Sequence, residues 1–144
     1  MHPYPHLYRV TASGSAAGDV TTGSTDLPDL AVAPPPEFDG PGGRWSPETL
    51  LCAAVADCFV LSFRAVAKAS RFDWISLDCS IEGVLERVDG VTRFTRFVNR
   101  ARLRVPAGTD AARARTMLEK AEKVCLVTSS LNAQVELVTE IDAS

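Results

Sequence analysis

The stretch that decides the fold is WSPETLLCAAVADCFVLSFRAVA, residues 45–67. It begins with Ser46 and Pro47, a pair that favours a helix start, because serine caps free backbone amides and proline suits the first helical position. Between Leu50 and Ala67, only Asp57, Ser62 and Arg64 interrupt a run of apolar, alanine and cysteine residues. The pattern predicts a helix that ends near Ala69 and is apolar around most of its circumference.

The length of this helix bears on the oligomeric state. A helix of about 23 residues is roughly 35 Å long, which is more than one 144-residue domain can easily surround. We therefore expect a second subunit to cover part of it, as in a homodimer. A membrane span is disfavoured, because Asp57 and Arg64 lie in the middle of the segment, where charge is expensive in lipid.

Composition limits the class of protein further. The chain has 144 residues, 46% of them hydrophobic, and carries 15 Lys+Arg against 18 Asp+Glu, a formal charge of −3. This length predicts one domain over residues 1–144 that needs no disulfide staples. The negative charge disfavours a nucleic-acid partner, and the arginines of 96–104 alternate with apolar residues as an amphipathic strand requires. The first ten residues lack a secretory signal pattern, so we expect a cytoplasmic protein.

The rest of the chain predicts a mixture of strands and helices. Proline and glycine concentrate in 33–47, which we expect to be a long functional loop without regular structure. The other expected elements are strands at 6–13, 18–23, 73–88, 91–105 and 133–141, and helices beginning near Asp110 and Cys125. The order ββ(β)–α–ββ–α–β belongs to the α+β class.

The four cysteines are the candidate reactive residues. A reducing cytoplasm disfavours structural disulfides, and the spacing of Cys52 and Cys58 does not fit zinc. We expect no metal or cofactor. Cys79 falls on the apolar side of its strand and Cys52 lies on an alanine-rich helix, so both are interpreted as packing residues. Taken alone, Cys58 would have the same interpretation.

Two motifs change this interpretation. The stretch 45–67 and the later KAEKVCLVTSSLNA, residues 120–133, resemble the two cysteine motifs of the OsmC/Ohr family of organic hydroperoxide reductases. The resemblance covers nearly the whole chain. It implies an OsmC-like fold, with antiparallel sheets packed on a long central helix, and an intertwined homodimer in which both chains bury each central helix.

The resemblance also implies roles for individual residues. Cys58 would be the peroxidatic cysteine, Cys125 the resolving cysteine, and Glu48 the acidic residue near the active centre. A thiolate attacks the peroxide to give a sulfenic acid, which a second thiol then converts to a disulfide. The helix dipole alone does not ionise Cys58, so a cation is required. The family's loop arginine is replaced here by Glu37, and Arg44 is our substitute candidate.

Two other sources of this cation stay open, namely Arg9 and an arginine on the basic strand of a partner subunit. The first functional hypothesis is a thiol-dependent peroxidase of organic hydroperoxides that uses a dithiol reductant, such as a lipoylated protein. Apolar neighbours would favour alkyl or lipid peroxides, and these are Leu51, Val55, Phe59 and Phe63. The alternative is a non-peroxidase OsmC-like protein that binds a small apolar ligand at the dimer interface. The missing loop arginine favours this alternative.

Overall fold

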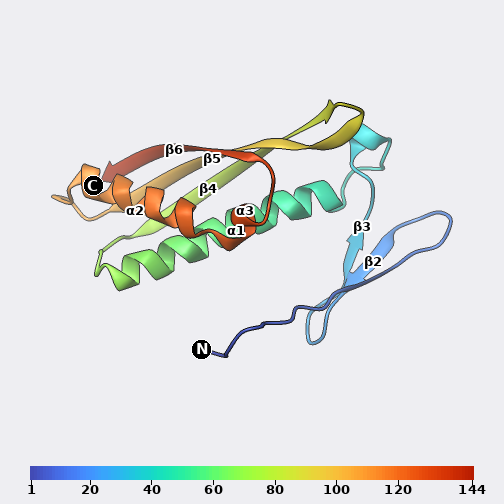
Figure 1. The fold of residues 1–144 in the computed structure, drawn as a ribbon, viewed down its shortest axis with the longest axis horizontal. Coiled ribbons are helices and arrows are strands. Elements are labelled where there is room, and N and C mark those ends of the chain that lie inside the picture. The colour runs from blue at the N-terminus through green and yellow to red at the C-terminus, as the bar shows by residue number, and fades with distance from the viewer. The chain divides into compact units, whose positions relative to one another are not determined.

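The computed structural model describes all residues from 1 to 144. The chain forms two compact units, residues 1–50 and 51–144, which are described one at a time. The elements follow in the order β1–β2–β3–α1–β4–β5–α2–α3–β6, with a short 3₁₀ turn, η1, before α1 (Figure 1). This is the α+β class that the sequence predicts. A single domain over the whole chain stays a prediction.

The first unit contains a small antiparallel sheet, in which the strands lie side by side in the order in which they follow one another along the chain. Its strands are β1 (Thr11–Ser13), β2 (Val20–Gly23) and β3 (Leu30–Val32). Thr11 pairs with Gly23 and Val20 pairs with Val32, so each neighbouring pair is antiparallel. The predicted β1–β2 hairpin is confirmed, although its first strand begins at Thr11 rather than at residue 6.

The proline-rich loop departs from our expectation at one point. We expected no regular structure over 33–47, but η1 (Pro36–Phe38) is a 3₁₀ helix. The Phe38 amide donates to the Pro35 carbonyl at 2.9 Å, which closes the turn. The physical reason is that Pro36 stands at the first helical position, where its fixed φ is suitable and its missing N–H is not needed.

Helix α1 (Pro47–Ala69) begins and ends as the sequence predicts. The Thr49 amide donates to Ser46 Oγ at 3.1 Å, and the Ser46 amide donates to Thr49 Oγ1 at 2.9 Å. This reciprocal pair satisfies two backbone donors, as a capping box does. Ser46 is buried, so the cap is held firmly in place.

The second unit is built on a three-stranded sheet in the order β4–β5–β6. The long strands β4 (Ser76–Val88) and β5 (Val91–Val105) form the predicted antiparallel hairpin, and its turn places Asp89 and Gly90 at positive φ. Strand β6 (Gln134–Ala143) pairs parallel to β5. The expectation of purely antiparallel sheets is therefore wrong here. The helices after β5 return the chain to the starting end of that strand, and such a crossover permits parallel pairing.

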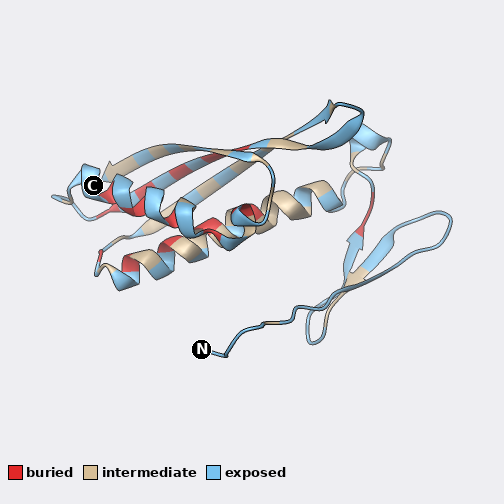
Figure 2. Cartoon of the chain, viewed as in Figure 1, coloured by how far each residue is buried: buried red, intermediate tan, exposed pale blue.

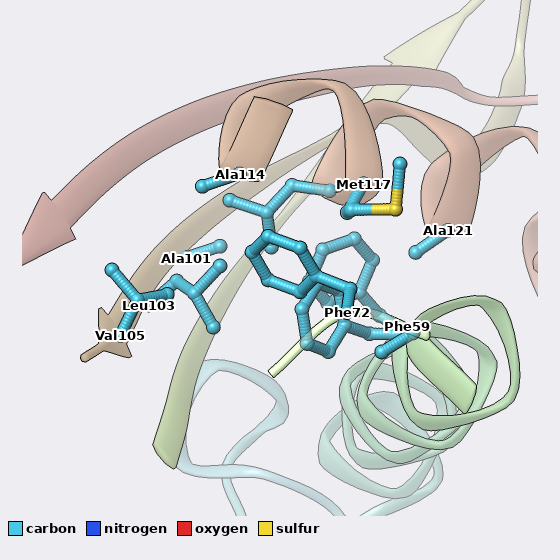
Figure 3. Close-up of a cluster of buried hydrophobic side chains, with 11 residues drawn as sticks. Phe59, Phe72, Ala101, Leu103, Val105, Ala114, Met117 and Ala121 are labelled. Carbon is cyan, nitrogen blue, oxygen red and sulfur yellow. The ribbon is translucent and has the colours of Figure 1, made fainter. Parts of the chain in front are cut away.

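Two helices connect β5 to β6, namely α2 (Ala111–Val124) and α3 (Leu126–Ser129). The side chain of Asp110 accepts from the Ala112 amide at 3.0 Å, which confirms the predicted start of α2. Helices α1 and α2 lie on the same side of the β4–β5–β6 sheet (Figure 1). Their facing side chains fill the space between helices and sheet with a single apolar core (Figure 3).

One face of α1 contributes to this core. Val55, Phe59, Phe63 and Ala67 are buried at four-residue spacing, and the rest of α1 is half-buried or exposed (Figure 2). Leu61 is 56% exposed. By length and composition α1 is also apolar enough to cross a membrane, with a window of mean hydropathy 1.9. Core helices of soluble proteins have the same length and composition, and α1 contributes side chains to the core here. Its cover by a second subunit stays a prediction.

Candidate active site

The fold brings Cys58 and Cys125 together. Cys58 lies in the middle of α1, and Cys125 lies at the junction of α2 and α3, where it is the N-cap residue of α3. Each thiol shifts the pKa of the other, so the two are neighbours, and both are free. Cys125 is fully buried, whereas Cys58 is partly exposed. Cys58 is therefore the more accessible of the two neighbouring thiols.

The surroundings of Cys58 favour its thiolate. Burial opposes ionisation, but hydrogen bonds to the sulfur outweigh it and lower the pKa of the Cys58 thiol below 9.0. The donors are the backbone amides of Val127 and Leu126 and the side chains of Cys125 and Ser62. The Cys58 Sγ to Ser62 Oγ distance is 3.9 Å. Neutral amides and hydroxyls thus supply part of the stabilisation that we had assigned to a cation.

The surroundings of Cys125 favour its neutral thiol. Burial raises the pKa of Cys125 above 9.0, and the neighbouring Cys58 raises it further, against hydrogen bonds from Thr128. When two thiols are in contact, only one ionises easily. The surroundings therefore lower the pKa of Cys58 and raise the pKa of Cys125.

Local hydrogen bonds explain why α3 presents its amides to Cys58. The Cys125 carbonyl accepts from Thr128 Oγ1 at 3.1 Å, from Ser129 Oγ at 2.9 Å and from the Ser129 amide at 3.1 Å. These bonds close the first turn of α3 and leave the amides of Leu126 and Val127 without partners inside the helix. Two hydroxyl residues in the motif after Cys125 are the sequence signal for this turn, and our sequence analysis did not use it.

A buried polar residue, Asn99, also escaped the sequence analysis. It lies on the core side of β5 among apolar neighbours and is fully buried. The Cys79 thiol donates to Asn99 Oδ1 at 3.1 Å, and burial is the main cause that raises the pKa of Cys79 to about 11. A polar residue at an alternating position where leucine or valine would fit was the available signal. Cys79 packs against the core, as predicted.

The first unit contains Glu48 and Arg44. The Arg44 guanidinium pairs with Asp19, with 2.9 Å between Nε and Oδ2, and this pair is exposed to solvent. Glu48 Oε2 is buried and has no hydrogen-bond partner. Arg44 therefore does not satisfy this oxygen within its own unit. The activating role predicted for Arg44 stays a prediction.

The apolar side chains predicted to surround the substrate are corrected in part. Val55, Phe59 and Phe63 are at most 1% exposed, because they pack in the interior, and they cannot line a substrate site on this chain. An apolar cavity of about 520 Å³ lies instead within the first unit. It is lined by residues of the small sheet, the proline-rich loop and the start of α1, which include Val32, Phe38 and Glu48. No cluster of three or more His, Cys, Asp or Glu side chains fit to hold a metal is present.

The fold and the paired thiols define an α+β protein with a two-cysteine site, and comparisons with known proteins identify its family. A family model described as OsmC-like protein matches residues 40–140. The chain belongs to the family of OsmC-like proteins. The YmaD protein of Bacillus subtilis, which is uncharacterized, is 26% identical over 138 residues, covering 94% of this chain and 92% of its own.

Two further relatives have names that indicate a function. Peroxiredoxin OsmC of Escherichia coli is 29% identical over 120 residues, covering 83% of this chain and 82% of its own. The crystal structure of an organic hydroperoxide resistance protein OsmC from Legionella pneumophila is 27% identical, with a TM-score of 0.75. The match covers 96% of this chain and 99% of that one. The resemblance seen in the sequence is thus confirmed at the level of family and fold.

Proposed function

We propose that this protein is a thiol-dependent peroxidase that reduces organic hydroperoxides through a Cys58 sulfenic acid and a Cys58–Cys125 disulfide. The observation that carries the proposal is the contact between two thiols whose pKa values shift in opposite directions. A peroxidatic cysteine needs an accessible thiolate, and a resolving cysteine must lie next to it and react after it. The names of the Escherichia coli and Legionella relatives support the same activity.

Each proposed step balances. The Cys58 thiolate attacks the terminal peroxide oxygen, so that an S–O bond forms, the O–O bond breaks and the alkoxide leaves to become an alcohol. The Cys125 sulfur then attacks Cys58, forming the disulfide and releasing the sulfenic oxygen as water. A dithiol reductant, such as a lipoylated protein, returns both cysteines to thiols and is itself oxidised. These reactions fit the cytoplasm, where thiols are kept reduced.

The remaining site residues are proposed to meet Cys58 across a homodimer. Ten residues separate Glu48 from Cys58 along α1, a rise of about 15 Å, so the two side chains of one chain do not touch. We propose that Glu48 and Arg44 of a second copy complete the site. The buried, unpartnered Glu48 Oε2 supports this, because a carboxylate oxygen without a partner is costly to bury.

The decisive experiment compares Cys58→Ser with Cys125→Ser. Cys58→Ser is expected to abolish consumption of cumene hydroperoxide, because no thiolate remains at the site of attack. Cys125→Ser is expected to consume about one equivalent per subunit and to hold Cys58 as a sulfenic acid that excess peroxide overoxidises. Peptide mapping of the wild type after one equivalent should find the Cys58–Cys125 disulfide.

The other two cysteines serve as internal controls. Cys52 and Cys79 are expected to stay reduced under the same treatment, because burial raises the pKa of both thiols. The assignment fails if Cys58 and Cys125 both remain free after peroxide, or if the disulfide runs to Cys52.

A second candidate function is the binding of a small apolar ligand without peroxidase activity. The apolar cavity of about 520 Å³ in the first unit favours it, since cavities of this size suit small molecules. Titration of free thiols before and after one equivalent of organic hydroperoxide separates the two candidates. Loss of two thiols per subunit supports the peroxidase, and no loss supports the ligand-binding protein.

A further inference from the structure

A polar cleft of about 460 Å³ lies on the face of the β4–β5–β6 sheet that the helices leave free (Figure 1). Its lining comes from all three strands and includes Glu86, Arg93, Arg96 and Gln134. Phe97 is buried in the interior, and successive side chains of a strand point to opposite faces, so Arg96 points away from the helices. The peroxidase steps described above use none of the lining residues.

A β-bulge shapes this cleft. Val84 on β4 pairs with Arg96 on β5, whereas the next residue, Leu85, pairs with Phe94, so Thr95 has no partner on β4. A bulge of this kind redirects the side chains of the longer strand. Thr95 therefore lines the cleft together with Arg96, although strict alternation would place these neighbours on opposite faces of the sheet.

The bulge also changes the partner of Glu86. Glu86 lies directly opposite Arg93, an arrangement in which opposite charges usually attract each other across the strands. Here, however, Glu86 Oε2 accepts from the Thr95 hydroxyl. The ion pairs of the chain involve other arginines, so the guanidinium groups of Arg93 and Arg96 both lack an ion-pair partner.

Two side-chain amides add to these groups. Gln134 begins β6, where it pairs with Arg96 in the parallel register, and Asn132 lies in the segment between α3 and β6. A guanidinium group only donates hydrogen bonds, whereas an amide both donates and accepts them. Since Glu86 already has a partner, the cleft offers mainly unpaired donors. A ligand that fits it must supply acceptors.

The charge of the lining selects among anions. Arg93 and Arg96 contribute two positive formal charges and Glu86 contributes one negative charge, which leaves a net charge of +1. A monocarboxylate balances this charge, whereas a phosphate group carries about −1.5 to −2 at pH 7 and is repelled by Glu86. The next carboxylates on this face, Glu82 and Glu136, lie one row further along the sheet and also oppose a dianion.

We propose that this cleft binds a small polar monocarboxylate. The carboxylate accepts N–H···O bonds from Arg93 and Arg96, whose planar guanidinium groups suit both of its oxygens. Asn132 and Gln134 bind hydroxyl or amide groups on the rest of the ligand. Val84 is the one apolar side chain of the lining, so the body of the ligand is polar. A cleft of this volume suits a small molecule, and its occupation is independent of the proposed peroxidase activity.

Calorimetric titration with D-gluconate tests the proposal. The wild type should bind gluconate saturably with millimolar affinity at low salt, where exposed charges are least screened. Sorbitol carries a hydroxymethyl group in place of the carboxylate and should not bind. Inorganic phosphate should bind more weakly than gluconate. The proposal is overturned if gluconate does not saturate, if sorbitol binds equally well, or if phosphate binds more tightly.

Arginine substitutions locate the binding site. Arg93→Gln and Arg96→Gln should each weaken gluconate binding by about tenfold, because each removes a charged donor. Arg100→Gln is the matched control, since Arg100 lies on the same strand and face but does not line the cleft. All three arginines are exposed, so the variants should fold normally. An equal loss in Arg100→Gln would indicate a general effect of charge and would contradict a site at the bulge.

Glu86→Gln tests the selection by charge. This substitution keeps an oxygen that accepts from Thr95 and raises the net charge of the lining to +2. Phosphate should then bind about tenfold more tightly than to the wild type, while gluconate binding changes less. Unchanged phosphate affinity in Glu86→Gln would overturn the assignment of a monocarboxylate to this cleft.

Discussion

At the scale of single residues, the site uses unequal surroundings for two identical thiols. Four neighbouring groups together outweigh the burial of Cys58 and lower its pKa, whereas burial dominates at Cys125 and raises its pKa. Both effects act on the same chemistry, because a hydrogen bond to sulfur favours the thiolate and a dry environment disfavours it. The difference between the two pKa values follows from these surroundings rather than from the cysteines themselves.

The lowered pKa of Cys58 predicts its reactivity with alkylating reagents. Since only the thiolate is alkylated, the curve of iodoacetamide rate against pH should have its midpoint below 9.0, and the curve for Cys52 should lie above it. If Arg44 of a partner adds to this activation, Arg44→Ala should move the Cys58 midpoint to higher pH. Arg9→Ala tests the second candidate for the activating cation in the same way.

Because the Arg44–Asp19 pair is exposed, an effect of Arg44→Ala on Cys58 can be separated from an effect on folding. An exposed ion pair contributes little to folding, so Arg44→Ala should leave thermal unfolding nearly unchanged. If the Cys58 midpoint is the same in Arg44→Ala and the wild type, Arg44 is not the activating cation. A shift in Arg9→Ala instead would assign that role to Arg9.

At the scale of elements, the contact between α1 and β4 depends on a glycine. A Cβ atom at Gly83 would lie 2.7 Å from Cys52 Sγ and 2.9 Å from Phe94 Cε1. The Gly83 amide also donates to the Cys52 thiol. Strand and helix therefore approach closely at this point, which explains why Cys52 is a packing residue.

This close approach predicts the effect of Gly83→Ala. The added methyl group should destabilise the protein by about 1–3 kcal/mol, because the neighbouring side chains must shift in a packed core. Urea unfolding measures the change. Cys52→Ala in the same chain should recover part of the loss, since Phe94 remains in the way. Purely additive effects of the two substitutions would contradict the proposed contact.

At the scale of the whole molecule, the apolar surface of α1 is larger than the part that one chain buries. The core buries Val55, Phe59, Phe63 and Ala67, and Leu61 remains 56% exposed. Only 28% of the apolar stretch of α1 is buried within one chain, and we predict that a second copy covers the rest. A homodimer would cover the exposed face and would bring Glu48 of one copy to Cys58 of the other.

The homodimer has a direct test. The wild type should sediment as a dimer at micromolar concentration and unfold without a populated native monomer. Leu61→Glu should produce monomers, because a charge on the exposed face of α1 opposes its burial. Val138→Glu is the control on β6, where the residue replaced is 44% exposed. A compact wild-type monomer in analytical ultracentrifugation would rule out the dimer and the site shared across it.

The sequence by itself determined the elements and their order. The Ser46 cap, the 3.6-residue and two-residue periods and the Asp89–Gly90 turn are local signals, because they depend on backbone hydrogen bonds and on which face a side chain occupies. They predicted α1, the long hairpin and α2 nearly to the residue. The two cysteine motifs identified the family. Both kinds of signal can be read without knowing what packs against what.

Only the tertiary structure decided which groups surround the two thiols. The contact of Cys58 with Cys125, the amides of α3 at the Cys58 sulfur and the parallel pairing of β6 join segments far apart in the chain. The burial of Asn99 is explained in part by Cys79, whose thiol donates to Asn99 Oδ1. The shifted pKa values of both thiols arise from desolvation and from hydrogen bonds to these distant groups. Such energies depend on distance and burial in the folded chain, which no local pattern of residues specifies.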